Sequence, residues 1–99
     1  CPKLRPHCSH IFHIYCLRVP QRDHLIDYLK SEGIATNIHY PIALPYLPAY
    51  SYLKHQPEDF PVASEYQNEI LSLPMYPELT DEQIIFISDS ILKFYSRQV

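Results

Sequence analysis

The sequence has little glycine, few basic residues and no long hydrophobic run, and each shortage excludes a class of protein. Gly33 is the only glycine among 99 residues, which excludes glycine-rich phosphate loops and dinucleotide fingerprints. Only 8 Lys and Arg are scattered along a chain of net charge −3, whereas nucleic-acid binding needs clustered cations. No apolar run approaches the roughly 20 residues of a membrane span, and no apolar signal core is visible. We therefore expect a cytoplasmic protein that binds neither nucleic acid nor membrane.

The three cysteines are an odd number, which argues against a disulfide framework. Two of them lie among histidines, and the cluster as a whole consists of Cys1, His7, Cys8, His10 and His13. Structural zinc sites usually pair closely spaced ligands in two separated knuckles, and this cluster has no second half. We assign no metal site, although a small metal-binding protein built on this cluster stays open as the weakest of three hypotheses.

Catalytic groups are also scarce. No serine lies on a nucleophile elbow, and no general base is placed by its spacing. A lysine that forms a Schiff base must be desolvated, but all four lysines fall at expected helix surfaces, in loops or near the start of the chain: Lys3, Lys30, Lys54 and Lys93. We assign no catalytic residue, and the chain by itself is not expected to be an enzyme.

A hydrophobic fraction of 46% is enough for one modest core. We expect an irregular lead-in over residues 1–9 and a single small domain over residues 10–99. β-Branched and aromatic residues predict a central strand over 10–19, followed by a helix over 21–32 and a second strand over 35–40. Gly33 is placed to form a left-handed helix cap with Ile34 as its apolar partner.

The second half of the chain predicts two more helices and one more strand. A short helical turn and a loop are expected over 51–59, and a helix then opens at Phe60 and Pro61 with Asp59 as its N-cap. The segment 71–76, which Pro74 interrupts and Pro77 follows, is too short for a helix, and we predict an edge strand, where proline is tolerated. Thr80 and Gln83 form a capping-box pattern at the start of the last helix. The fold class is α+β, an α/β sandwich whose three- to four-stranded sheet is covered by about three helices.

The segment from Gly33 to Tyr50 is the candidate site. It passes through the second expected strand into a stretch stiffened by three prolines, and it presents His39, Tyr40, Tyr46 and Tyr50. Aromatic and imidazole groups offer stacking area and hydrogen bonds to a polar ligand. Asn37 shares a strand face with His39. Two alternatives stay open: the tyrosines simply cover the edge of a core, and Tyr40 packs inward with Ile38.

Five motifs follow one another along the chain: Arg22–Ile34, Ile38–Pro41, Pro48–Tyr50, Asp59–Ala63 and Leu71–Thr80. In this order, and over residues from about 10 to 95, the chain is similar to the C-terminal small domain of the DegT/DnrJ/StrS aminotransferases. These are pyridoxal-phosphate enzymes that aminate keto groups on nucleotide-linked sugars.

The resemblance implies the C-terminal part of a fold-type-I enzyme, without the large domain that carries the cofactor lysine. It implies pyridoxal phosphate in the parent enzyme but not on this chain, which alone would be inactive. His39 and Tyr40 are carried over as nucleotide-sugar contacts, and Asn37, Tyr46 and Tyr50 are further candidates.

The resemblance further implies glutamate as amino donor, a keto-deoxysugar nucleotide as acceptor, a homodimer whose active site both subunits build, and a role in polysaccharide or deoxysugar synthesis. Many relatives carry a His and a Gln where this chain has Leu44–Leu47, which leaves the identity of the sugar open. The choice between an aminotransferase and a dehydratase also stays open, because the residue that separates them lies in the absent domain. A hypothesis of another class is a stand-alone, non-catalytic binding module of the same fold.

Overall fold

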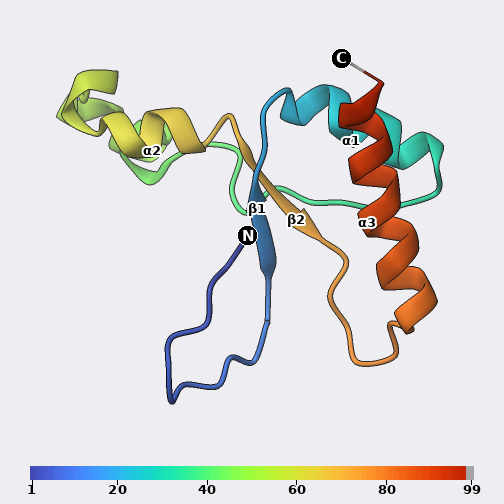
Figure 1. The fold of residues 1–99 in the computed structure, drawn as a ribbon. Helices are drawn as coiled ribbons and strands as arrows, with labels where there is room; N and C mark the ends of the chain where they lie inside the picture. Colours follow the sequence, from blue (N-terminus) through green and yellow to red (C-terminus); the bar gives the residue numbers. More distant parts are fainter. Residues whose placement is uncertain (98–99) are drawn as a thin grey trace.

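The computed structural model of the chain describes residues 1–97 and has an α+β fold (Figure 1). Two short paired strands lie at its centre, with two helices on one side of them and a third on the other. The strands are β1 (Tyr15–Arg18) and β2 (Ile70–Leu73), and the helices are α1 (Arg22–Ser31), α2 (Pro61–Tyr66) and α3 (Asp81–Ser96). Three short 3₁₀ helices precede α2: η1 (Leu44–Tyr46), η2 (Pro48–Leu53) and η3 (Pro57–Asp59).

The sheet has fewer strands than expected. β1 pairs with β2 in antiparallel register, with Cys16 opposite Ser72. The strand expected over 35–40 is reduced to a single bridge, in which Asn37 and Ser72 exchange both backbone hydrogen bonds at 3.1 and 2.7 Å. The side chain of Asn37 accepts the amide hydrogen of Ile38 at 2.8 Å, and such local bonds compete with a strand ladder.

The order across the sheet also differs from the prediction. β2 was expected at an edge, yet among the described residues it lies between β1 and the bridge at Asn37. β1, which was expected to be central, pairs on one side only. The predicted strand over 71–76 contained Pro74, whereas β2 ends at Leu73, directly before that proline. No proline therefore lies among the paired residues of β2, and the reason for placing the strand at an edge does not apply.

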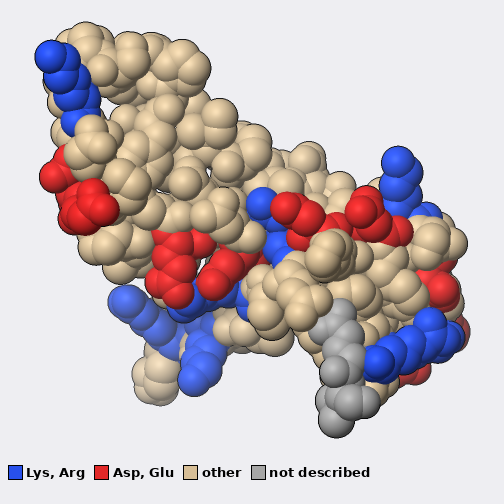
Figure 2. Space-filling model, turned by 90° about the horizontal axis from the view of Figure 1, so that it is seen from above, with Lys and Arg blue, Asp and Glu red and all other residues tan. Residues whose placement is uncertain are grey.

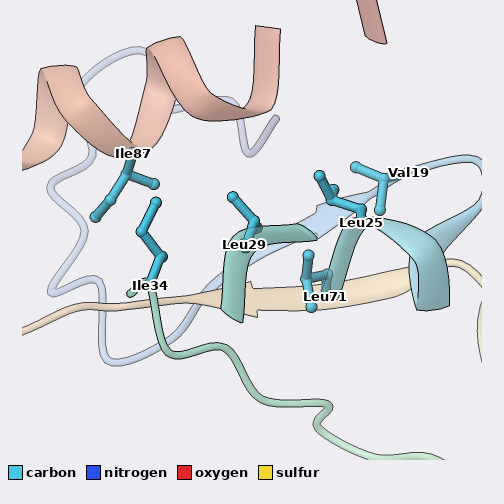
Figure 3. Close-up of a cluster of buried hydrophobic side chains, with 6 residues drawn as sticks. All are labelled: Val19, Leu25, Leu29, Ile34, Leu71 and Ile87. Atoms are coloured by element: carbon cyan, nitrogen blue, oxygen red, sulfur yellow. The ribbon is translucent and has the colours of Figure 1, made fainter. Parts of the chain in front are cut away.

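The core is a small cluster between α1, α3 and one face of the sheet (Figure 3). Leu25 and Leu29 of α1 and Leu71 of β2 are fully buried. Figure 3 shows the side chains of α1 between β2 and Ile87 of α3. Among residues 1–97, the buried apolar residues are Val19, Leu25, Leu29, Ile34, Leu71 and Ile87. The α1–α3 side of the molecule therefore supplies most of the hydrophobic stabilisation.

Two of the three predicted helix caps are confirmed, and one is wrong. Gly33 has a φ of 80°, its amide donates to Lys30, and the amide of Ile34 donates to Leu29 at 2.8 Å, which is a Schellman cap. The capping box of Thr80 and Gln83 is confirmed. Asp59 is not the N-cap of α2, because Phe60 takes that place and the Asp59 carboxylate accepts the amide hydrogen of Gln56 at 2.7 Å.

The molecule is open in shape. Its radius of gyration is 15.9 Å, whereas a compact domain of this length has about 13 Å. α2 and the 3₁₀ helices lie away from α1 and α3, and the first residues form a long excursion without helix or strand (Figure 1). The outward side of α3 carries Ile85 and Leu92, which are 59% and 68% exposed. Figure 2 shows broad uncharged surface between scattered acidic and basic side chains.

None of the helices within residues 1–97 is long and apolar enough to cross a bilayer. Over the same residues, no three His, Cys, Asp or Glu side chains are grouped so that they could hold a metal ion.

Candidate functional site

The bridge at Asn37 positions the first part of the candidate site. His39 lies two residues beyond it, and the Nδ1 atom of its half-buried ring is 2.9 Å from Oγ of Ser72. Ser72 is only 4% exposed. The Nδ2 atom of Asn37 lies 3.4 Å from Nε2 of His39. Backbone and side-chain bonds to one buried serine therefore fix the orientation of the imidazole.

Tyr40 extends the site outward. Its ring meets the ring of His39 edge to face, with the centroids 5.5 Å apart and the planes at 89°. The side chain is 72% exposed, so the alternative in which it packs inward is wrong for this chain. It borders a hollow of about 320 Å³ whose other lining residues are Pro41, Ile42, Leu44 and Leu47. An exposed ring beside an apolar hollow is suited to stacking with a planar or saturated ring.

Tyr46 has its hydroxyl in use within the fold. The hydroxyl oxygen is 2.5 Å from Oγ of Ser64 in α2, and the side chain is half-buried. It lines a second hollow, of about 480 Å³, with Pro41, Ile42, Pro57, Ser64, Gln67 and Asn68. The Gln67 side chain accepts the amide hydrogen of Ala43 at 2.8 Å. Together, these bonds tie the proline-rich segment to α2.

Tyr50 is a residue of η2 and is 38% exposed. Within residues 1–97 its side chain makes no hydrogen bond or ring contact with the other candidates. The structure thus brings together Asn37, His39 and Tyr40, places Tyr46 at a neighbouring hollow, and leaves Tyr50 apart. Tyr50 stays a candidate on the strength of the sequence resemblance alone.

Ser72 and Gln67 were not predicted as residues of the site. A signal for Ser72 was present, because a serine between Leu71 and Leu73 in a strand must face away from both and a buried hydroxyl needs a partner. The sequence did not indicate that His39 is this partner, because His39 lies 33 residues earlier in the chain. Gln67 carried no signal, because nothing in the sequence indicates that its side chain reaches Ala43.

The lysines do not fit a cofactor site. Lys3, Lys30, Lys54 and Lys93 are all exposed, and none has the desolvated surroundings that favour Schiff-base formation. The residues present therefore do not hold pyridoxal phosphate by themselves.

A model of the DegT/DnrJ/EryC1/StrS aminotransferase family matches residues 2–92. The pleiotropic regulatory protein of Geobacillus stearothermophilus is 42% identical over 86 residues, which are 87% of this chain and 23% of that protein. The erythromycin biosynthesis sensory transduction protein EryC1 of Saccharopolyspora erythraea is 41% identical over 81 residues, which are 82% of this chain and 22% of that protein.

A solved structure agrees with the sequence comparison. The crystal structure of DesV from S. venezuelae in complex with a ketimine intermediate superposes with a TM-score of 0.86 and 29% identity, over 94% of this chain and 25% of that one. The chain thus spans a quarter or less of the length of these relatives, and the portion matched is C-terminal. Because the family model covers most of the chain, the chain belongs to the DegT/DnrJ/EryC1/StrS aminotransferase family.

Proposed function

We propose that the chain is the C-terminal part of a pyridoxal-phosphate-dependent aminotransferase that aminates a keto-deoxysugar nucleotide, and that it supplies substrate contacts but no cofactor lysine. The observation that carries the proposal is the pair of adjacent rings of His39 and Tyr40, presented at the surface and anchored by buried Ser72. The pair offers a hydrogen-bonding nitrogen next to an exposed aromatic face. A nucleotide-linked sugar has hydroxyl groups for the first and ring surfaces for the second.

The names of relatives support this substrate class. They include a transaminase of dTDP-3-amino-3,6-dideoxy-α-D-galactopyranose from Aneurinibacillus thermoaerophilus and one of dTDP-3-amino-3,4,6-trideoxy-α-D-glucose from Streptomyces venezuelae. We extend that chemistry to this chain, with glutamate as the amino donor. Pyridoxal phosphate would be held by the remainder of that enzyme, where it would supply the amino-transfer chemistry. We propose that Asn37 and Tyr46 support the contacts of His39 and Tyr40, that Tyr50 adds a further one, and that the product serves polysaccharide or deoxysugar synthesis in the cytoplasm.

The shape of the chain supports a place within a longer, dimeric enzyme. Its radius of gyration exceeds that of a compact domain of its length, and the apolar side chains of Ile85 and Leu92 face outward from α3. Exposed apolar surface of this kind usually marks contact with another protein surface. We propose that the remainder of the enzyme, from the same subunit and its partner, covers this surface.

The first test is to read the DNA immediately upstream of the codon for Cys1 in the source genome. An open reading frame that continues for a few hundred residues and contains a lysine in a pyridoxal-phosphate setting supports the proposal. A genuine start codon next to Cys1 contradicts it, and leaves the stand-alone binding module as the better hypothesis.

The second test uses the protein that such a frame encodes. With glutamate and a dTDP-linked keto sugar, replacing His39 or Tyr40 by alanine is expected to raise KM about tenfold, which corresponds to about 1.4 kcal/mol. Tyr52→Ala is the matched control, because Tyr52 is as exposed as Tyr40 at 72% and lies in η2, outside the cluster. The 99-residue chain alone should show no turnover, and measurable turnover would contradict the assignment of its lysines.

A further inference from the structure

The hydrogen bonds around His39 determine which of its ring nitrogens carries the proton. Asn37 is the starting point, because the two atoms of its side-chain amide are distinguishable here. Its Oδ1 atom accepts the amide hydrogen of Ile38 at 2.8 Å. A flipped amide would place an NH₂ group against that N–H, so that two donors would face each other. The Nδ2 group is therefore the one that faces His39, at 3.4 Å from Nε2.

The proton on His39 follows from this orientation. An amide NH₂ group can only donate, so Nε2 of the neutral imidazole must be the acceptor, and the proton must lie on Nδ1. The Nδ1–H group then donates to Oγ of Ser72, 2.9 Å away. The opposite tautomer would turn Nε2–H toward the Asn37 donor.

We infer that Asn37 and Ser72 are positioning residues that orient the imidazole of His39 and select the tautomer with its proton on Nδ1, so that Nε2 is presented to the ligand as a hydrogen-bond acceptor. The contact with Asn37 is long, at 3.4 Å, so a better donor can displace it. A sugar hydroxyl is such a donor, whereas an ionised phosphate oxygen only accepts. This inference rests on the proposed function and deepens it: His39 recognises the sugar portion of the nucleotide-sugar and not its diphosphate.

The tautomer can be measured on the 99-residue chain without any ligand. Long-range ¹H–¹⁵N spectra of its imidazoles at about pH 8, above the ordinary range of histidine titration, distinguish a protonated Nδ1 from a protonated Nε2. We expect the Nδ1–H pattern for His39. The Nε2–H pattern, or the mixture typical of a free imidazole, would overturn the inference.

Two substitutions separate the roles of the positioning residues. Ser72→Ala removes only the acceptor of Nδ1–H, and the Nδ1–H population should fall; Ser72→Thr, which keeps a hydroxyl, should restore it. Asn37→Asp keeps the acceptor for Ile38 but replaces the donor that faces Nε2 by an acceptor, so His39 should switch to the Nε2–H pattern. Asn37 is exposed, so this variant does not depend on repacking the sheet. Unchanged patterns in Ser72→Ala and Asn37→Asp would contradict the positioning roles.

The ligand is tested on the longer protein that the upstream reading frame encodes, with two probes, dTDP-glucose and dTDP. The Nε2 resonance of His39 should shift with dTDP-glucose and not with dTDP. An equal shift with dTDP would overturn the assignment of His39 to the sugar, because a phosphate contact needs a hydrogen on Nε2. The tautomer is measured without ligand, so the two ideas can fail separately: the wrong tautomer contradicts this inference, and a lack of binding by both probes contradicts the proposed contact site.

Discussion

Arg22, the first residue of α1, donates a hydrogen bond from Nη1 to the backbone carbonyl oxygen of Ile70, the first residue of β2, at 3.0 Å. The same nitrogen reaches the carbonyl oxygen of Gln67 at 3.2 Å, and Nε is 2.6 Å from the carboxylate of Asp23. The Arg22 residue is 8% exposed. One buried guanidinium therefore joins α1 to the connection between α2 and β2.

Replacing Arg22 by methionine should lower the free energy of unfolding by about 2–3 kcal/mol. The methionine fills much of the space but leaves two carbonyl oxygens without a donor, and unpaired buried groups are costly. Arg18→Met is the matched control. Arg18 is exposed, and its ion pairs with Glu65 and Glu69 lie at the surface, where such pairs contribute about 0–1 kcal/mol. Urea denaturation of both variants makes the comparison, and equal losses would contradict the role of Arg22.

Replacing Gly33 by alanine should cost about 1–2 kcal/mol in the free energy of unfolding. A Cβ atom at this position would meet no heavy atom within 4 Å, so the cost comes only from the left-handed backbone at φ 80°. Gly33→Asn should cost less, because asparagine tolerates this conformation. If thermal or urea unfolding shows equal losses for the two variants, the Schellman cap is not what makes this position selective.

The stability of the fold is expected to depend on pH through the hydroxyl of Tyr95. Its hydroxyl donates to the carbonyl oxygen of Pro20 at 2.7 Å, and burial raises the pKa of Tyr95 above its ordinary value of 10.0. The unfolded chain therefore loses this proton at a lower pH than the folded chain. The stability that the neutral hydroxyl provides is complete below about pH 10 and is lost as the pH rises through the folded-state pKa.

Comparison with Tyr95→Phe isolates that effect. The variant lacks the hydrogen bond to Pro20 and should be less stable than the unaltered chain by about 1 kcal/mol at pH 8. The difference should shrink as the pH rises beyond 10, because the phenylalanine does not titrate. Tyr52→Phe, at an exposed position, should show no such trend. A Tyr95→Phe difference that stays constant from pH 8 to 11 would contradict the prediction.

Tyr46 and Tyr50 should respond differently to loss of the hydroxyl. Tyr46→Phe removes the bond to Ser64, 2.5 Å long, and should lower the free energy of unfolding by about 1 kcal/mol. Tyr50→Phe should change it by less than about 0.5 kcal/mol, as expected for a surface position without such a bond. Chemical denaturation of the two single variants tests this. The reverse order would show that Tyr46 does not hold the proline-rich segment to α2.

The sequence predicted best where the information is local. The cap at Gly33 and the capping box of Thr80 and Gln83 both depend on residues within one turn of each other, and both are confirmed. The α+β class is confirmed as well, and is shared with the family's solved structures. The prediction of Asp59 as the N-cap of α2 was wrong, although it also rested on local sequence. Asp59 is the last residue of η3, and its carboxylate takes part in the capping box of that helix.

Prediction was weaker where distant segments meet. The extent of pairing at Asn37 and the central place of β2 depend on contacts between segments more than 30 residues apart, which no periodicity encodes. The motif resemblance pointed to His39 and Tyr40, but Ser72 could not be connected to them before the bridge was known. Whether these residues contact a substrate stays a prediction.

The bridge between Asn37 and Ser72 has a consequence for dynamics. It is an isolated bridge and is not continued as a ladder on either side, so the segment with His39 and Tyr40 can lift away from β2 while β1 and β2 stay paired. Such a local opening needs less free energy than global unfolding. The amide hydrogen of Ser72 points to Asn37 and should exchange with solvent faster than that of Leu29 in the core helix. Its exchange rate would then report how often the binding segment detaches.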